Sequence, residues 1–160
     1  RTGVRRVRLQ MMQTAPLDAT LTTSVADADS LRYYPAYAEL NLAALPPQPA
    51  VAAASGLQLL MAQRIDGSLT IGDTHGYDEP FEFDVEEAPY DELYRRAAAV
   101  IGPEMPRVVR RWAGVYSQTT DGRLYARHDV TEGVVIVTGV GGRGMTCSPA
   151  IAAETFEAVG

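Results

Sequence analysis

Four glycines fall within six residues near the C-terminal end of the sequence, directly after a β-branched apolar run. The run is residues 134–138 (Val-Val-Ile-Val-Thr), and the glycine-rich segment continues from it as residues 139–146 (Gly-Val-Gly-Gly-Arg-Gly-Met-Thr). Glycine lets a backbone come close to a ligand, and a helix N-terminus favours an anion or an electron-rich oxygen. A buried strand, a glycine turn and a helix in this order can therefore bind such a group.

The letters of residues 139–144 also fit the pattern Gly-x-Gly-x-x-Gly. A dinucleotide-binding unit needs in addition a second strand and an acidic residue about 20 positions further on. The sequence ends at Gly160, so we expect the pyrophosphate-binding unit to lie elsewhere. The spacing leaves a second interpretation open, in which the glycine turn only closes the strand onto the helix.

The other residues that could do chemistry are few. The two histidines, His75 and His128, lack the spacing of a metal site, and we expect no metal. The sequence contains no evident Ser/His/Asp or Cys/His constellation, so it identifies no catalytic residue. His75 follows a predicted hairpin among polar residues, and it is either a solvated or structural histidine or part of a site.

Composition limits the function classes. With 160 residues and 46% hydrophobic content, the chain can bury a core, as one domain or as one domain plus a piece of another. The net charge of −6 and the scattered arginines argue against nucleic acid as a partner. No apolar run is long enough for a membrane span, and no leader opens the chain. A single cysteine, Cys147, suits the cytoplasm.

The first half of the chain contains strand, connection and hairpin patterns. Residues 4–12 alternate apolar and polar side chains, as in a half-buried strand that ends at residues 14–16. Residues 31–37 carry three tyrosines, which either pack a sheet against a helix or face a substrate. Residues 42–55 are rich in alanine and proline and predict a surface connection. Residues 57–73 form a hairpin around an Asp-Gly turn.

The second half adds a helix and three strands. Residues 89–101 begin with proline, carry acids early and arginines late, and precede Gly102, so they predict a helix. Strands are expected at residues 108–116 and 123–129, before the apolar run at 134–138. The expected fold is α+β, a mostly antiparallel sheet with a central helix and a terminal strand, glycine turn and helix.

Several stretches together resemble the D-amino-acid oxidase/glycine oxidase superfamily of FAD-dependent amine oxidoreductases. The stretches are residues 111–116 (Arg-Trp-Ala-Gly-Val-Tyr), 119–125 (Thr-Thr-Asp-Gly-Arg-Leu-Tyr) and 137–149 (Val-Thr-Gly-Val-Gly-Gly-Arg-Gly-Met-Thr-Cys-Ser-Pro). Residues 10–16 and 71–77 narrow the resemblance to a branch associated with aminophosphonate breakdown.

The resemblance implies a division of the chain. Residues 1–130 would form the substrate-binding α+β domain, and residues 131–160 would return to an absent N-terminal domain, completing its Rossmann-like, FAD-binding fold. By this resemblance the chain would be the C-terminal half of such a protein. Its start at Arg1, without methionine and directly in strand-like sequence, also suggests a piece of a longer chain. The cofactor would be FAD, with the glycine turn at the edge of the flavin. The residues carried over for FAD binding are Gly141, Gly142, Arg143, Gly144, Met145 and Thr146.

The sequence departs from the resembled family at Tyr116. Relatives that bind a carboxylate place an arginine there and a proline at the position of Ser117. This departure suggests a different acidic group or a different anchor for it. The substrate-binding residues that we select are Tyr34, His75, Tyr77 and Tyr116, with Arg143 as a candidate partner of a phosphonate.

Two hypotheses about function follow. In the first, the chain is part of an FAD-dependent oxidoreductase that oxidises the C–N bond of a small amine, an aminophosphonate or an amino acid, by hydride transfer to the flavin. In the second, it is a non-catalytic α+β binding domain whose glycine turn is structural. We expect the chain on its own to be inactive, and its last strand, lacking parallel neighbours, to be disordered or to dimerise into a homo-oligomer.

Overall fold

The computed structural model describes residues 3–159, and their contacts divide the chain into two compact units. The central unit is Arg8–Gly114. The terminal unit combines the residues up to Val7 with those from Val115 onwards. The boundary therefore falls inside two strands, β1 (Val4–Pro16) and β5 (Val108–Thr119), each of which contributes residues to both units.

Most strands belong to a five-stranded sheet of order β2-β3-β4-β1-β5. The other members are β2 (Val25–Ala26), β3 (Leu60–Gln63) and β4 (Ser68–Gly72). The pairings of β2 with β3, β3 with β4, and β4 with β1 are all antiparallel. Since helices accompany these strands, the prediction of an α+β fold with a mostly antiparallel sheet is confirmed.

The predicted hairpin is formed by β3 and β4, with Gln63 opposite Leu69. Its turn is stabilised by Asp66, whose carboxylate accepts hydrogen bonds from the backbone N–H of Ser68 at 3.0 Å and from its hydroxyl at 2.6 Å. Gly67 has a φ of 82°, a backbone angle that side-chain-bearing residues rarely adopt. The Asp-Gly pair thus fixes the turn for local reasons.

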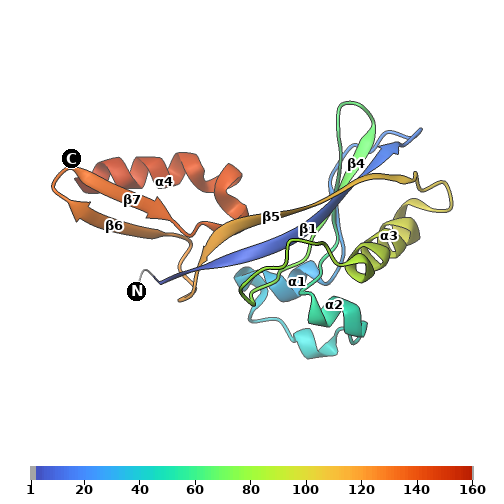
Figure 1. The fold of residues 1–160 in the computed structure, drawn as a ribbon, viewed down its shortest axis with the longest axis horizontal. Helices are drawn as coiled ribbons and strands as arrows, with labels where there is room; N and C mark the ends of the chain where they lie inside the picture. The colour runs from blue at the N-terminus through green and yellow to red at the C-terminus, as the bar shows by residue number, and fades with distance from the viewer. Residues whose placement is uncertain (1–2, 160) are drawn as a thin grey trace. The chain divides into compact units, whose positions relative to one another are not determined.

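The central helix is α3 (Glu87–Ile101), and Gly102 ends it with a φ of 102°. Leu93 and Ala97 are fully buried in the core against the sheet, whereas Val100 of the same helix is 54% exposed. The shorter helices α1 (Ser30–Tyr33) and α2 (Ala50–Ala54) lie on the same side of the strands as α3 (Figure 1).

Two sequence predictions about the central unit need correction. Strand β1 ends at Pro16, as expected, but it is not half-buried: from Val7 to Gln10 it is buried on both faces, because helices and loops cover its polar face as well. The connection at residues 42–55 is not only a surface segment. It contains α2, and Ala52 of this helix is fully buried in the core, since its small side chain lets α2 approach α3.

A cluster of charged residues joins α3 to the segment before α1. The guanidinium of Arg96 donates hydrogen bonds to Asp27 at 2.7 Å, Asp29 at 2.5 Å and Glu92 at 2.8 Å. Burial alone would raise the pKa of Asp29, but hydrogen bonds from Arg96, Gln48 and Arg32 outweigh it and lower that pKa. The pKa of Glu92 is lowered mainly by its hydrogen bonds with Arg95, and also by Arg96.

We predict that Arg96→Leu lowers the free energy of unfolding by about 2 kcal/mol, because it leaves three carboxylates without their shared cation. The side chain of Arg96 is only 11% exposed. Arg95→Leu is the matched control. It also removes a partner of Glu92, but its side chain is 62% exposed, so the loss should stay below about 0.5 kcal/mol. Urea denaturation at pH 7 measures both.

The same pair of variants tests pH dependence. Because the folded-state pKa values of Asp29 and Glu92 are lowered, their contribution is complete above the ordinary values of 3.8 and 4.5 and is lost as the pH falls through the folded values. The difference in stability between the wild type and Arg96→Leu should therefore shrink below about pH 4. An equal difference at pH 7 and pH 3 would contradict this assignment.

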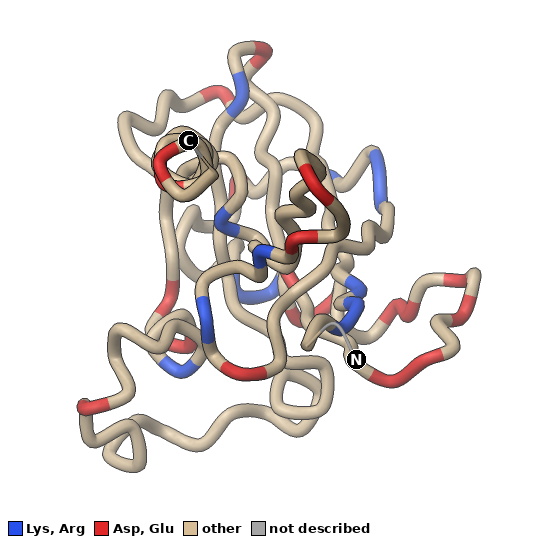
Figure 2. Tube along the Cα trace, turned by 90° about the vertical axis from the view of Figure 1, so that its left-hand side faces the viewer, with Lys and Arg blue, Asp and Glu red and all other residues tan. Residues whose placement is uncertain are grey.

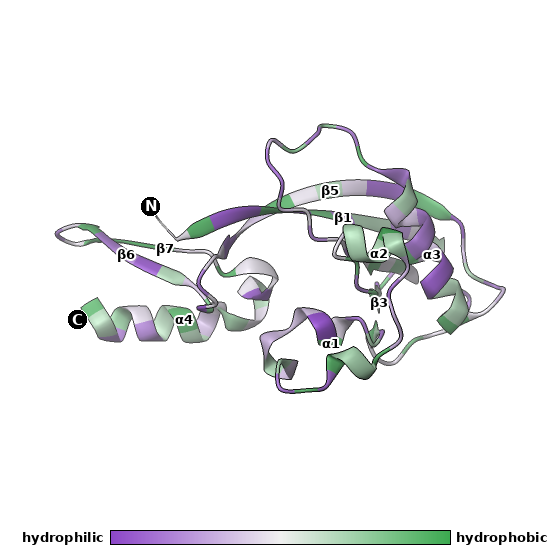
Figure 3. Ribbon diagram, turned by 90° about the horizontal axis from the view of Figure 1, so that it is seen from below, coloured by the Kyte–Doolittle hydropathy of each residue, from purple (hydrophilic) through white to green (hydrophobic). Residues whose placement is uncertain are grey.

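In the terminal unit, β6 (Ala126–Thr131) pairs antiparallel with β7 (Val134–Thr138) as a separate two-stranded sheet. Helix α4 (Gly144–Val159) runs alongside this pair, and both carry apolar residues (Figures 1 and 3). The prediction that residues 134–138 form a strand is confirmed, but the strand is not buried here. Ile136 is 49% exposed and Phe156 of α4 is 75% exposed.

Candidate functional site

The glycine turn has the predicted strand–turn–helix form. Strand β7 ends at Thr138, a short 3-10 helix covers Gly141–Arg143, and α4 begins at Gly144. Gly139 has a φ of 76° and Gly141 a φ of 65°, both in the left-handed region that favours glycine. The path of the chain through the turn therefore requires glycine at these two positions.

Strand β5 holds the turn in place. The backbone N–H of Thr119 donates to the carbonyl of Gly139 at 3.0 Å, and the N–H of Gly139 donates to the hydroxyl of Ser117 at 3.1 Å. A side chain at Gly139 would place its Cβ 3.1 Å from Cγ2 of Thr119. Gly139 is thus required by lack of space as well as by its backbone angle.

Tyr116, the predicted substrate residue on β5, lies directly at this turn. A Cβ on Gly142 would be 3.6 Å from the hydroxyl oxygen of Tyr116, and a Cβ on Gly141 would be 3.8 Å from its ring. A guanidinium nitrogen of Arg143 lies 3.9 Å from the same Gly141 position. The structure therefore brings together four predicted residues: Tyr116, Gly141, Gly142 and Arg143.

Gly142 itself has no left-handed φ, and its surroundings leave an ordinary van der Waals distance for a Cβ. It is exposed, as are Met145 and Thr146 in the first turn of α4. Among the described residues, neither backbone strain nor crowding explains a glycine at this position. The close approach of a bound group would explain it. This observation fits the binding of a cofactor at the turn.

His75 occupies a buried site in the central unit, so it is not a solvated histidine. It is 4% exposed, its ring stacks on that of Tyr33 at a centroid distance of 4.0 Å, and its Nδ1 lies 3.0 Å from the carbonyl oxygen of Gly56. Tyr33 in turn contacts Tyr34 edge-on at 5.2 Å. The structure thus connects the predicted residues Tyr34 and His75 through Tyr33, which the sequence analysis did not select.

A buried carboxylate accompanies His75. Nε2 of His75 lies 3.9 Å from Asp73, and the side-chain amide of Gln58 donates to Asp73 at 3.3 Å. Burial raises the pKa of Asp73, and the neighbouring His75 and Gln58 offset part of this rise. This cluster stabilises the loop after β4 from inside the central unit.

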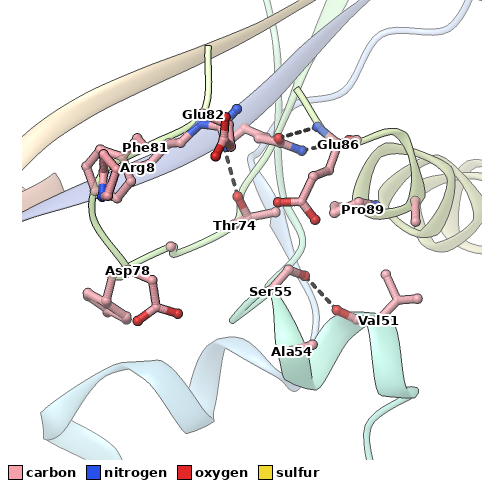
Figure 4. Close-up of a pocket in the computed structure, with 15 residues that line it drawn as sticks. Arg8, Val51, Ala54, Ser55, Thr74, Asp78, Phe81, Glu82, Glu86 and Pro89 are labelled. Atoms are coloured by element: carbon pink, nitrogen blue, oxygen red, sulfur yellow. Dashed lines mark hydrogen bonds between the residues drawn. The ribbon is translucent and has the colours of Figure 1, made fainter. Parts of the chain in front are cut away.

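Tyr77 contributes to a cavity of about 360 Å³ that lies between β1, α2 and the start of α3 (Figure 4). The side-chain amide of Gln10 bonds to both the N–H and the carbonyl of Glu86, at 2.8 and 2.9 Å, and Arg8 donates to the carbonyl of Asp84. The hydroxyl of Thr74 accepts from the N–H of Gln10 at 3.0 Å. These polar groups bind the protein backbone, which gives the cavity a structural frame.

Arg8, Gln10 and Thr74 also line this cavity, and they are not among the residues predicted for a site. The available signal was the alternation of Arg8 and Gln10 with the apolar residues Val7, Leu9 and Met11. The wall that faces them is the segment between β4 and α3, in which six of the ten residues 78–87 are acidic. Figure 2 shows how acidic and basic residues are distributed along the backbone of the chain.

Comparison with known proteins identifies the family. Residues 3–158 match the family model described as DAO, FAD dependent oxidoreductase. The chain belongs to this family. FAD is the family's cofactor, so the prediction of FAD is confirmed, and so is the resemblance at this level.

Among solved structures, the chain is similar to glycine oxidase from Geobacillus kaustophilus, with 20% sequence identity and a TM-score of 0.61. The similarity covers 94% of this chain and 33% of that chain, so the chain spans about a third of the length of the glycine oxidase. At this identity the likeness shows a shared fold. No curated protein matches the chain.

Because FAD is the family's cofactor, the residues of the glycine turn can be compared with what a flavin requires. The turn presents exposed Gly142, Met145 and Thr146 at the N-terminus of a 16-residue helix. Backbone N–H groups in a helix's first turn lack partners within the helix, and they favour negative charge. The residues present therefore fit the electron-rich edge of a flavin.

The described residues contain no group of three or more His, Cys, Asp or Glu that could hold a metal ion. None of the helices within residues 3–159 is long and apolar enough to cross a membrane.

Proposed function

We propose that this chain is the substrate-binding part, with the returning C-terminal strand and helix, of an FAD-dependent oxidoreductase that oxidises the C–N bond of a small amine. The observation that carries the proposal is the position of Tyr116 beside the glycine turn, in a chain that belongs to an FAD-dependent family. It places a candidate substrate residue beside candidate cofactor-binding residues.

We infer the roles of the two parts of the chain from the exposed surfaces of the terminal unit. An apolar groove of about 300 Å³ runs between β7 and α4, lined by Val137, Val140, Ile151 and Phe156 among others. Apolar surface of this kind is costly to leave in water. Because the chain spans about a third of the similar glycine oxidase, we assign residues 131–160 to packing against a nucleotide-binding domain outside this chain. Residues 1–130 then supply the substrate side.

When bound, FAD supplies the acceptor of two electrons for the oxidation of the C–N bond. The backbone of residues 141–146 would hold the flavin and stabilise the negative charge that develops on it, as an oxyanion hole does. Tyr116 would orient the substrate beside the turn. Tyr34, His75 and Tyr77, which belong to the central unit, are the further substrate-binding residues of this proposal.

The substrate in this proposal is an aminophosphonate or a related amino acid. Two observations support this choice. Tyr116 stands where carboxylate-binding relatives carry an arginine, and Arg143 lies at the same turn. A phosphonate offers three oxygens and more negative charge than a carboxylate, so it can use donors from several directions. We place the enzyme in the cytoplasm, in keeping with its single cysteine.

The proposal is tested on the full-length protein by absorbance. We expect a bound flavin spectrum, bleached when an aminophosphonate or amino acid is added without oxygen. A full-length protein that stays colourless after incubation with FAD would instead support the rival hypothesis of a non-catalytic binding domain.

The isolated 160-residue chain gives a second prediction. We expect it to bind FAD weakly or not at all, because the sites for the pyrophosphate and the adenosine lie in the other domain. The exposed apolar groove should make it self-associate. Isothermal titration measures the affinity, and sedimentation measures the association. Sub-micromolar affinity of the isolated chain for FAD would show that the division of the cofactor site is wrong.

A further inference from the structure

Two polar residues beside the glycine turn were not selected from the sequence. Arg5 of β1 donates a hydrogen bond from its guanidinium to the side-chain oxygen of Gln118 of β5, at 3.3 Å. Gln118 follows Tyr116 by two positions on the same strand, so their side chains share a face of the sheet. Arg5 is therefore tied to the face that carries Tyr116.

A second guanidinium reaches the same place. The position that a Cβ on Gly141 would occupy lies 3.8 Å from Cγ of Gln118, 3.8 Å from the ring of Tyr116 and 3.9 Å from a guanidinium nitrogen of Arg143. Arg143 comes from the turn, whereas Arg5 comes from β1 and Gln118 from β5. Side chains from β5 and the turn thus meet at one half-buried point, and Arg5 of β1 is joined to it through Gln118.

Arg5 and Arg143 bring two positively charged side chains to this cluster. Two acidic side chains of the terminal unit interact elsewhere: Asp121 pairs with Arg123, and Glu154 accepts a hydrogen bond from Tyr125. A guanidinium presents planar N–H donors that match the oxygens of a carboxylate or phosphonate. The cluster of Arg5, Tyr116, Gln118 and Arg143 can therefore bind an anionic group.

We propose that Arg5, held by Gln118, acts with Arg143 as the anchor for the acidic group of the substrate, in place of the arginine that is absent at position 116. Gln118 is a positioning residue. The identity of the ligand as substrate rests on the proposed function, but the existence of an anion site at these residues does not.

The matched pair of variants for this proposal is Arg5→Gln and Arg6→Gln in the full-length protein. Both remove one positive charge from neighbouring positions, but side chains of successive strand residues point to opposite faces, so only Arg5 shares the face of Tyr116. Isothermal titration with methylphosphonate and with acetate measures anion affinity without turnover. For whichever of the two anions binds more tightly, we expect Arg5→Gln to lower the affinity at least about tenfold. Arg6→Gln should change that affinity less than about twofold.

Gln118→Leu tests the positioning role. Without its hydrogen-bond partner, Arg5 samples more conformations, so KM for the amine substrate should rise several-fold while kcat is kept. The double variant with Arg5→Gln should bind the anion no more weakly than Arg5→Gln alone, since Gln118 acts through Arg5. Additive losses would contradict this role.

The outcomes separate this proposal from the proposed function. Equal affinities in Arg5→Gln and Arg6→Gln would overturn the anchor, even if the protein binds flavin and oxidises amines. A selective loss in Arg5→Gln would support the anchor, even in a protein without amine oxidation, in which case the proposed function fails instead. Loss for methylphosphonate alone would identify a phosphonate as the acidic group, and loss for acetate alone a carboxylate.

Discussion

Gly142→Val is expected to remove tightly bound FAD from the full-length protein while leaving the central unit folded. The nearest atoms to an added Cβ are the hydroxyl oxygen and ring carbons of Tyr116, at ordinary contact distances of 3.6–3.9 Å, and the backbone at Gly142 needs no left-handed φ. Valine therefore fits locally. If the flavin lies against the turn, however, valine displaces it from the backbone donors of residues 142–145, a loss of about 2–4 kcal/mol that corresponds to roughly a hundredfold in affinity.

Three measurements check this prediction: the flavin content, the flavin reduction potential and the rate of reduction by the amine. The potential should fall, because donors that stabilise the reduced flavin are displaced. The matched control is Gly114→Val on β5, where nothing lies within 4 Å of the added Cβ and φ is not left-handed. If Gly142→Val keeps normal flavin content, potential and reduction rate, the turn is only a structural closure.

Gly139 and Gly141 are less suitable for this test. Both have left-handed φ angles, and Gly139 also lacks space for a Cβ. Substitution at either position strains the turn itself, at a cost of about 1–3 kcal/mol. A loss of flavin would then report on the turn and not on contact with the cofactor.

Tyr116→Arg is expected to shift substrate preference towards α-amino carboxylates. The change places a fork-shaped donor next to Gly142, where carboxylate-binding relatives of the resembled family carry arginine. A bidentate bond between a guanidinium and a carboxylate contributes about 1.5–3 kcal/mol, which predicts a gain in kcat/KM for glycine or a D-amino acid of about ten- to a hundredfold.

Tyr116→Phe provides the control, because it keeps the ring beside Gly142 and adds no charge. It should leave the preference between carboxylates and phosphonates within about threefold. If neither glycine nor any D-amino acid gains turnover in Tyr116→Arg, Tyr116 does not face the substrate. The contact of Tyr116 with the turn would then serve packing alone.

Elements fixed by local interactions could be predicted from the sequence. The Asp66-Gly67 turn, the helix that ends at Gly102 and the strand–turn–helix at residues 134–159 depend on backbone angles and on patterns a few residues long. The predicted site residues around the turn are also near one another in sequence, except for Tyr116. Its contact with Gly142 could only be suggested by the resemblance.

Features that depend on distant parts of the chain were decided by the tertiary structure. The burial of His75 against Tyr33, and of Gln10 against Glu86, joins residues more than 40 positions apart, and no local pattern specifies such pairs. Ala52 was assigned to a surface connection because its alanine-rich segment lacks a periodic apolar pattern.

The sequence by itself determined the glycine turn, because left-handed backbone angles select glycine wherever they occur. It also indicated the family, because the order and spacing of the motifs are visible in the sequence alone. Only the tertiary structure placed Arg5 against Gln118, 113 residues away, since strand pairing brings together side chains that the sequence separates. It likewise decided that the apolar residues of β7 and α4 stay exposed in this chain, because an apolar pattern marks a surface that needs covering and does not say what covers it.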